Sequence, residues 1–401
     1  MAAAKQSPFE SVTINLEHDI DEQYQYQPGE IIRGKIGIQL HRSTLVQSVY
    51  LTITGDGICA WEDDYLGSLE SKENYIDATQ AIFDAEGLAR YLDTGFHHFP
   101  FEYRLPENIP SSFIGKFGSV TYILKAVVEG DRPGDTTIAT EPFLVMRKCL
   151  LPENLSEPRK IKLAKTYFSM CSWGKVKADI HIDRTGFVPG EDICLQAEVQ
   201  NHSPLRITAI QAGLMMESVY HAQKNLISYR QIVNKRRDDF ELIDGDGRRW
   251  QNVRIGIPAY VPESFLEGCD IIELSYKFQF RIELSSGKEL KVEIPITVGA
   301  DPKGLALPGP NKNDENVNIH WTMGPRDLAK KQIEEQREMS AWTVASPEFR
   351  DREQVMNPLF RNESEKLRNG DRPHLESSGF NHDDYEDEIA PDYPGSEDTR
   401  L

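Results

Sequence analysis

LPENIPSSFIG, at residues 105–115, returns in altered form as IPAYVPESFLEG at residues 257–268. In both copies two prolines precede a Ser-Phe pair, and a long run of alternating apolar residues follows. A second match lies upstream, because YQPGE at 26–30 returns as FVPGE at 187–191. Each of these has an aromatic residue, a Pro-Gly turn and an acid that lead into an expected strand.

A third match lies downstream and compares EPFLV at 141–145 with IPITV at 294–298. One Pro-Gly turn would carry little weight, because such turns are common in β-rich proteins. Three matches in the same order indicate instead that the second half of the folded region copies the first.

Each copy has the pattern of a β-sandwich. Apolar residues alternate with polar ones, as half-buried strands require, and Gly/Pro turns interrupt them at short intervals. The alternation is clearest at Val12, Ile14 and Leu16, at Val49, Leu51 and Ile53, and at Leu195, Ala197 and Val199. The sequence therefore predicts an all-β fold with two tandem immunoglobulin-like sandwiches at residues 8–148 and 173–300, joined by a linker at 149–172.

Residues 75–92 fit two descriptions. Ala78, Ala81, Ile82, Ala85, Leu88 and Leu92 would lie on one face of a helix. A strand from Tyr75 to Phe83 followed by a loop accounts for the same residues, and the pattern alone does not decide between them.

The last hundred residues lose this alternation. In 301–401 prolines accumulate and acidic residues outnumber basic ones, a composition that buries too little apolar surface to offset the entropy of ordering. We expect a disordered acidic tail. Residues 325–339 are an exception, since an initial proline and a Lys331-to-Glu335 spacing favour a short exposed helix.

Composition excludes several functions. A net charge of −19 disfavours binding to phosphate backbones, so no nucleic-acid partner is expected. The five cysteines include no CxxC pair, and the Asp244–Gly247 segment reads as a hairpin turn and not as a calcium loop. The first residues lack the apolar stretch of a leader peptide, no run of about 18 apolar residues occurs, and no catalytic motif is found, so we expect neither export nor a membrane span. We expect a cytoplasmic, non-enzymatic protein without a metal or cofactor.

Two segments carry a family resemblance. Residues 96–130, with PSSFIGKFGS, resemble the N-terminal arrestin domain, and residues 174–214, with GFVPGE and NHS, resemble the start of the C-terminal one. The chain most resembles the arrestin-domain-containing proteins, or α-arrestins. The resemblance implies two arrestin sandwiches in an adaptor for endocytosis and protein transport, with a receptor or transporter as cargo and peripheral recruitment to the plasma membrane or endosomes. The alternative is a structural arrestin-fold subunit of a sorting coat.

The tail departs from the α-arrestin pattern. Many α-arrestins carry PPxY motifs that bind ubiquitin ligases, whereas this chain has only Ala390-Pro391-Asp392-Tyr393, in which the first proline is missing. Ligase recruitment through Pro391 and Tyr393 is therefore weakly supported. The final Thr399-Arg400-Leu401 has the hydroxyl and aliphatic residues that a PDZ groove accepts.

One further candidate site is a basic patch around the Asp244–Gly247 turn. Its members are Lys235, Arg236, Arg237, Arg248 and Arg249. If they converge they could bind phosphoinositide headgroups or acidic cargo. The alternative is a solvated loop in which these cations pair with Asp238, Asp239 and Glu241.

Overall fold

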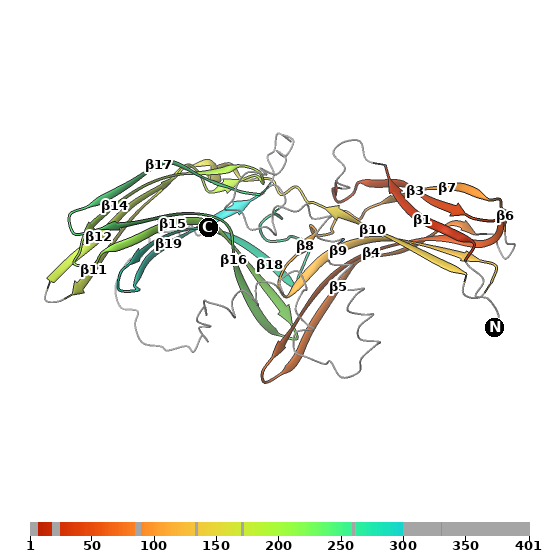
Figure 1. Cartoon of the computed structure of the whole chain (residues 1–401), viewed down its shortest axis with the longest axis horizontal. Coiled ribbons are helices and arrows are strands. Elements are labelled where there is room, and N and C mark those ends of the chain that lie inside the picture. Colours follow the sequence, from red (N-terminus) through yellow and green to blue (C-terminus); the bar gives the residue numbers. More distant parts are fainter. Residues whose placement is uncertain are drawn as a thin grey trace, which may run out of the picture. The chain divides into compact units, whose positions relative to one another are not determined.

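The computed structural model describes residues 7–17, 25–84, 90–132, 135–169, 172–258, 261–299 and Lys330. These residues form β-strands almost throughout, with one short 3-10 turn at Glu153–Ser156 (Figure 1). None of the helical structure described is long and apolar enough to span a membrane. Because the described residues lie almost entirely in β-strands, the all-β prediction is confirmed.

The first sandwich pairs a three-stranded sheet, ordered β1-β3-β7, with a seven-stranded sheet ordered β2-β10-β9-β4-β5, in which β6 pairs with β4 and β8 with β9. The strands are β1 (Phe9–Leu16), β2 (Gln25–Tyr26), β3 (Ile31–Leu40), β4 (Thr44–Asp63), β5 (Gly67–Asp84), β6 (Arg90–Leu92), β7 (Gly95–Arg104), β8 (Phe113–Ile114), β9 (Gly118–Gly130) and β10 (Thr136–Val145).

The second sandwich pairs a four-stranded sheet, ordered β11-β12-β14-β17, with a five-stranded sheet ordered β13-β19-β18-β15-β16. The strands are β11 (Arg159–Ser169), β12 (Ser172–Ile182), β13 (Gly186–Phe187), β14 (Asp192–His202), β15 (Ile207–Ala222), β16 (Asn225–Leu242), β17 (Gly247–Gly256), β18 (Ile272–Leu284) and β19 (Glu289–Val298).

The repeated Pro-Gly turns have the same hydrogen bonds in both sandwiches. Gly29 and Gly190 have φ angles of 82° and 91°, which favour glycine. The carboxylate of Glu30 accepts a hydrogen bond from the Gln27 amide at 2.8 Å. Glu191 accepts the equivalent bond from Val188 at 2.8 Å. The turn acid of each repeat therefore closes its own turn.

The repeated Pro-x-Ser segments also have equivalent contacts. The Tyr122 hydroxyl donates to the Pro110 carbonyl at 2.6 Å, and Tyr276 donates to Pro262 at 2.8 Å. The Ser264 hydroxyl accepts from the Val298 amide at 2.9 Å, as Ser112 does from Val145 at 3.0 Å. The sequence repeat thus reflects a duplicated set of bonds that tie each segment to the long strand and the closing strand of its sandwich.

The structure settles the open reading of residues 75–92 in favour of a strand. Residues up to 84 continue β5, which pairs with β4 along its length from Asp63↔Gly67 to Ser48↔Asp84. The helical alternative is wrong because this pairing satisfies the backbone, with Ile76 buried between the partly buried Tyr75 and the exposed Asp77. Residues 85–89 lie outside the described residues.

Two boundaries also differ from the sequence analysis. Arg159–Ser169 form β11, paired residue for residue with β12, so the second sandwich begins inside the expected linker. The Asp244–Gly247 segment does not close a hairpin. β16 pairs with β15 and β17 pairs with β14, so this turn connects the two sheets of the sandwich. An Asp-Gly pair specifies the turn locally, whereas the strand partner is chosen by long-range packing.

Candidate interaction surfaces

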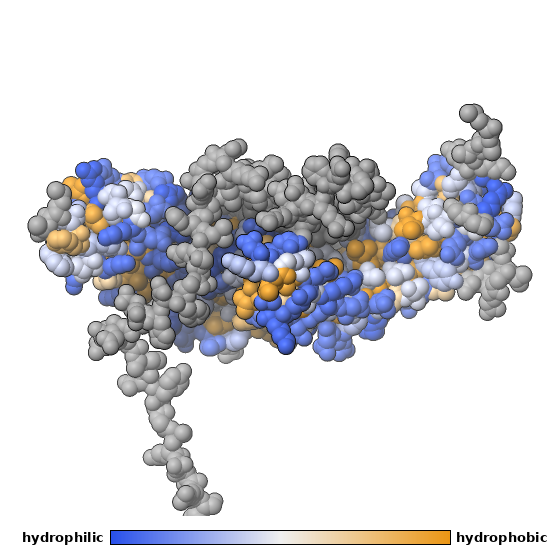
Figure 2. All heavy atoms as spheres, turned by 90° about the horizontal axis from the view of Figure 1, so that it is seen from below, coloured by the Kyte–Doolittle hydropathy of each residue, from blue (hydrophilic) through white to orange (hydrophobic). Residues whose placement is uncertain are grey.

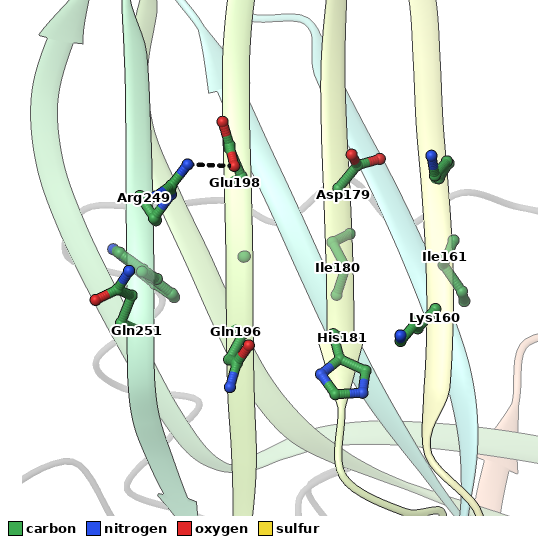
Figure 3. Close-up of a pocket in the computed structure, with 12 residues that line it drawn as sticks. Lys160, Ile161, Asp179, Ile180, His181, Gln196, Glu198, Arg249 and Gln251 are labelled. Atoms are coloured by element: carbon green, nitrogen blue, oxygen red, sulfur yellow. Dashed lines mark hydrogen bonds and ion pairs between the residues drawn. The ribbon is translucent and has the colours of Figure 1, made fainter.

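A shallow hollow of about 400 Å³ lies on the outer face of the β11-β12-β14-β17 sheet (Figure 3). Three consecutive residues of each strand line it. The middle residues, Ile161, Ile180, Ala197 and Trp250, are apolar, and the last three of these are buried. Its polar lining consists of Lys160, Lys162, Asp179, His181, Gln196, Glu198, Arg249 and Gln251. We call it the outer hollow.

The strand register sets the order of charges across the outer hollow. Lys162 lies opposite Asp179, Asp179 opposite Glu198, and Glu198 opposite Arg249. Arg249 donates to Glu198 at 2.8 Å. Hydrogen bonds from Gln200 and Arg249 lower the pKa of Glu198. The row therefore reads cation, anion, anion, cation, and offers partners of both signs to a polypeptide that crosses the sheet.

The basic patch of the sequence analysis is largely internally paired. Arg237 makes two hydrogen bonds of 2.7 Å to Glu283 and one of 2.9 Å to Asp239. Arg248 donates to Asp238 at 2.7 and 3.0 Å. Arg249 donates a hydrogen bond to Glu198 and lines the outer hollow. Among the described residues only Lys235 and Arg236 of the five lack an ion pair. Glu241, a suggested partner, pairs instead with Arg206 at 2.6 Å.

The candidate tail sites cannot be placed. Pro391, Tyr393, Thr399, Arg400 and Leu401 all lie outside the described residues. Of the segment 325–339 only Lys330 is described, and its Nζ lies 3.3 Å from the Glu141 carboxylate. No group of three or more His, Cys, Asp or Glu side chains in the described part of the chain could hold a metal ion.

Contacts between the two sandwiches were not anticipated from the sequence. Phe117 of the first sandwich meets Tyr220 of the second edge-on, with ring centroids 5.7 Å apart. The Lys116 amine lies 4.6 Å above the ring of Tyr229. The Cys59 thiol, which is fully buried, donates to the His221 carbonyl at 3.2 Å. Burial raises the pKa of Cys59 to about 11, so it is a structural thiol and not an activated nucleophile.

Glu263 is a buried acid where the sandwiches meet. Its residue is 4% exposed, and within the described part of the chain neither carboxylate oxygen has a hydrogen bond of good geometry. Burial raises its pKa to about 7, against the smaller lowering effects of the Ser111 hydroxyl and Arg147. Ser111 occupies the same position in the first repeat, so the duplicated site has a hydroxyl in one copy and a carboxyl in the other.

Two tandem sandwiches with duplicated tie points, a polar outer face and aromatic contacts between them define an arrestin-fold protein. Residues 13–151 match the family model of the arrestin (or S-antigen) N-terminal domain, and residues 172–303 match that of the C-terminal domain. Together these matches cover more than half of the chain. The protein belongs to the arrestin family and is α-arrestin-like.

Curated relatives agree with this placement. Arrestin domain-containing protein 17 of Caenorhabditis elegans is 28% identical over 303 residues, which are 69% of this chain and 68% of that protein. Arrestin domain-containing protein 4 of Mus musculus is 27% identical over 295 residues, 69% of each chain. Arrestin domain-containing protein 1 of Homo sapiens is 24% identical over 283 residues, 68% of this chain and 61% of that protein.

Proposed function

We propose that this protein is a trafficking adaptor that binds the cytoplasmic segment of a membrane receptor or transporter and links it to endocytic or ubiquitin-dependent transport. Membership of an arrestin-like adaptor family supports the general role. The observation that carries the proposal is the outer hollow, whose polar side chains from four strands lie open to a partner.

The chemistry of the outer hollow suits an extended polypeptide. Neighbouring strands are about 4.8 Å apart, so a chain crossing four strands spans about 14 Å and meets the Lys162-to-Arg249 row in sequence. β11 is also an edge strand, with one row of backbone groups available for pairing. A cargo segment that crosses the sheet is recognised by these charges, whereas one that pairs with β11 runs along the sheet edge, so these are two alternative modes of binding.

The outer hollow can be tested by reversing its two flanking cations. The full chain with Lys162→Glu and Arg249→Glu should label membrane-protein cargo at least tenfold less than the unmodified chain in cellular proximity labelling. Like charges opposed at close range cost a complex several kcal/mol. Folding should be little affected, since exposed ion pairs contribute about 0–1 kcal/mol.

A matched control replaces one arginine and one lysine on strands of the first sandwich, Arg33→Glu and Lys72→Glu. Both side chains are 55% exposed and each has one carboxylate partner. Labelling should stay within twofold of the unmodified chain. Cargo labelling that survives the outer-hollow reversal would refute this site. A constant-stoichiometry complex that forms without cargo would favour the sorting-coat alternative.

A further inference from the structure

β11 is an edge strand with a free row of backbone groups. It pairs residue for residue with β12 and is the last strand of its sheet (Figure 1). In an antiparallel pair every second residue points its N–H and C=O groups away from the partner strand. No other described strand pairs with β11, so a further strand can be added along its free side.

This edge is strongly cationic. Residues 159–177 contain no acidic residue, although the chain as a whole has a net charge of −19. The basic residues of this stretch are Arg159, Lys160, Lys162, Lys165, Lys175 and Lys177. Among the residues that the structure describes, none of the six has an ion pair with a carboxylate. The edge therefore favours an acidic partner and disfavours a second copy of β11, which would place like charges opposite each other.

β5, at the end of a sheet in the first sandwich, provides a contrast. Four of its residues are acidic, and its single basic residue, Lys72, lies 3.5 Å from the Asp56 carboxylate. On the face shown in Figure 2, hydrophobic patches alternate with hydrophilic surface, so exposed apolar groups do not distinguish one edge from another. Charge does distinguish these two edges, since an acidic strand is repelled by β5 and attracted by β11.

The chain itself contains an acidic segment with a matching pattern. Six of the ten residues at 383–392, DDYEDEIAPD, are acidic and none is basic. We call residues 384–389 the tail segment; they lie outside the described residues. In an extended chain one face of it carries Asp384, Glu386 and Glu388, and the other carries Tyr385, Asp387 and Ile389. Pro391 follows, and a proline ends a strand because it lacks an N–H group.

The two faces of β11 complement the two faces of the tail segment. Lys160 and Lys162 are exposed on one face, whereas Ile161 and Leu163 are half-buried against the sandwich core on the other. A strand added beside them places its three alternating acids next to the lysines and its tyrosine and isoleucine on the apolar side. A shift of one residue would place the three acids on the apolar side, so the alternation selects the register.

The intervening chain is long enough for this contact to form within one molecule. The described part of the second sandwich ends at Gly299, and the tail segment begins at Asp384. A flexible chain of about 85 residues has an r.m.s. end-to-end distance of about 50 Å, which exceeds the length of about 36 Å that β11 spans. Tethering keeps the tail segment at an effective concentration on the order of 1 mM, so weak pairing is sufficient.

We propose that the tail segment adds to β11 as a further strand of the second sandwich, with its acids beside Lys160 and Lys162. Backbone pairing holds the added strand, and charge selects it. The contact itself does not depend on the adaptor role. One consequence does rest on that role: the bound tail segment excludes cargo from the β11 edge and screens Lys162 of the outer hollow, so cargo has to displace it.

Hydrogen exchange of the full chain tests this pairing without any cargo. Glu386→Pro removes an amide from the middle of the tail segment and leaves the sequence of β11 unchanged. β11 amides should exchange about fivefold faster in this variant than in the unmodified chain, because their outward groups return to water. Amides of β17, the opposite edge of the same sheet, should exchange equally in both chains. Equal exchange of the β11 amides in the two chains would overturn the proposal.

Glu365→Pro is the matched control, because it makes the same substitution in another acidic part of the tail. It should leave the exchange of β11 within about twofold of the unmodified chain. If it accelerates exchange as much as Glu386→Pro does, the contact is not made by the tail segment and the proposal is wrong. Protection of β11 that appears only at high protein concentration also overturns it, because the added strand then belongs to a second copy.

A chemical cross-link tests the charge contact independently. A carbodiimide joins an amine to a carboxylate in contact with it, so it should link Lys160 or Lys162 to an acid of the tail segment. Lys160→Glu with Lys162→Glu should abolish this link, and adding Asp384→Lys, Glu386→Lys and Glu388→Lys should restore it. A swapped chain that stays unlinked overturns the proposal. Since no cargo takes part, failure here leaves the outer hollow untouched, and failure of the cargo-labelling test leaves the tail contact untouched.

Discussion

Replacing Asn201 with alanine should lower the free energy of unfolding of the second sandwich by about 3–5 kcal/mol. Asn201 is fully buried. Its side-chain amide donates to the carbonyls of Leu205 at 2.8 Å and Leu242 at 2.9 Å. Its side-chain oxygen accepts from the backbone and the hydroxyl of Ser203, at 3.0 and 2.8 Å. In the alanine variant the Ser203 hydroxyl can still donate to the Leu205 carbonyl, at 3.2 Å. The Ser203 amide and the Leu242 carbonyl lose the bonds that Asn201 makes to them, and a buried group left unpaired costs about 1–3 kcal/mol.

Native-state hydrogen exchange of the full chain, resolved by peptide, would separate the two sandwiches. Amides of β14 and β15 should exchange faster in Asn201→Ala, while those of β3 and β9 should not change. His202→Ala is the matched control, because His202 is the exposed neighbour of Asn201 and should change stability by less than about 0.5 kcal/mol. A loss below about 1 kcal/mol in Asn201→Ala would show that water or rearrangement replaces its bonds.

Asn201 illustrates which parts of the fold were accessible from the sequence. Alternation with period two and the Pro-Gly turns are local signals, so the two sandwiches and their duplication could be predicted. The NHS run at 201–203 was recognised only as part of the resemblance. Asn201 lies in β14 and its side chain bonds Leu242 of β16, a strand of the other sheet. This link between the two sheets involves a residue that is distant in sequence.

β11 shows a signal that was present and not used. Ile161 and Leu163 alternate with lysines, which is the pattern of a half-buried strand, but proline and lysine in the surrounding segment favoured a linker. Among the described strands β11 pairs with β12 alone and lies at a sheet edge, and most of its residues are exposed. A weakly buried edge strand has a weak hydrophobic pattern, and only its pairing identifies it.

The candidate surfaces were less predictable for a related reason. To predict the charge row of the outer hollow, the register of four strands would have to be known. Two of them, β14 and β17, are neighbours in the sheet but are separated in the sequence by β15 and β16. The burial of Glu263 requires packing between the sandwiches. Comparing the repeats does expose one anomaly, the acid at 263 where the first copy has Ser111. An ionisable residue in place of a buried hydroxyl is a usable signal.

Replacing Glu263 with glutamine should stabilise the protein by roughly 3 kcal/mol at pH 8 and change stability little at pH 4. Burial raises the pKa of Glu263 from its ordinary value of 4.5 to about 7. Below pH 4.5 the carboxyl is protonated in the folded and the unfolded protein, so it has no net effect. Between pH 4.5 and 7 only the unfolded chain ionises, and stability falls as the pH rises. Above pH 7 the full cost of a buried carboxylate is present.

Charged neighbours do not remove this cost. Arg147 lies near enough to lower the pKa of Glu263, but its Nε forms an ion pair of 3.3 Å with the more exposed Glu267. The negative charge of Glu267 in turn raises the pKa of Glu263. Thermal unfolding of the full chain between pH 4 and 8 would measure the effect, with Glu102→Gln as a control on an exposed strand carboxylate. The control should shift stability by less than about 0.5 kcal/mol at every pH. A gain for Glu263→Gln that does not grow between pH 4 and 8 would mean that Glu263 stays ionised in the fold. In that case a cation or ordered water would have to satisfy the carboxylate where the two sandwiches meet.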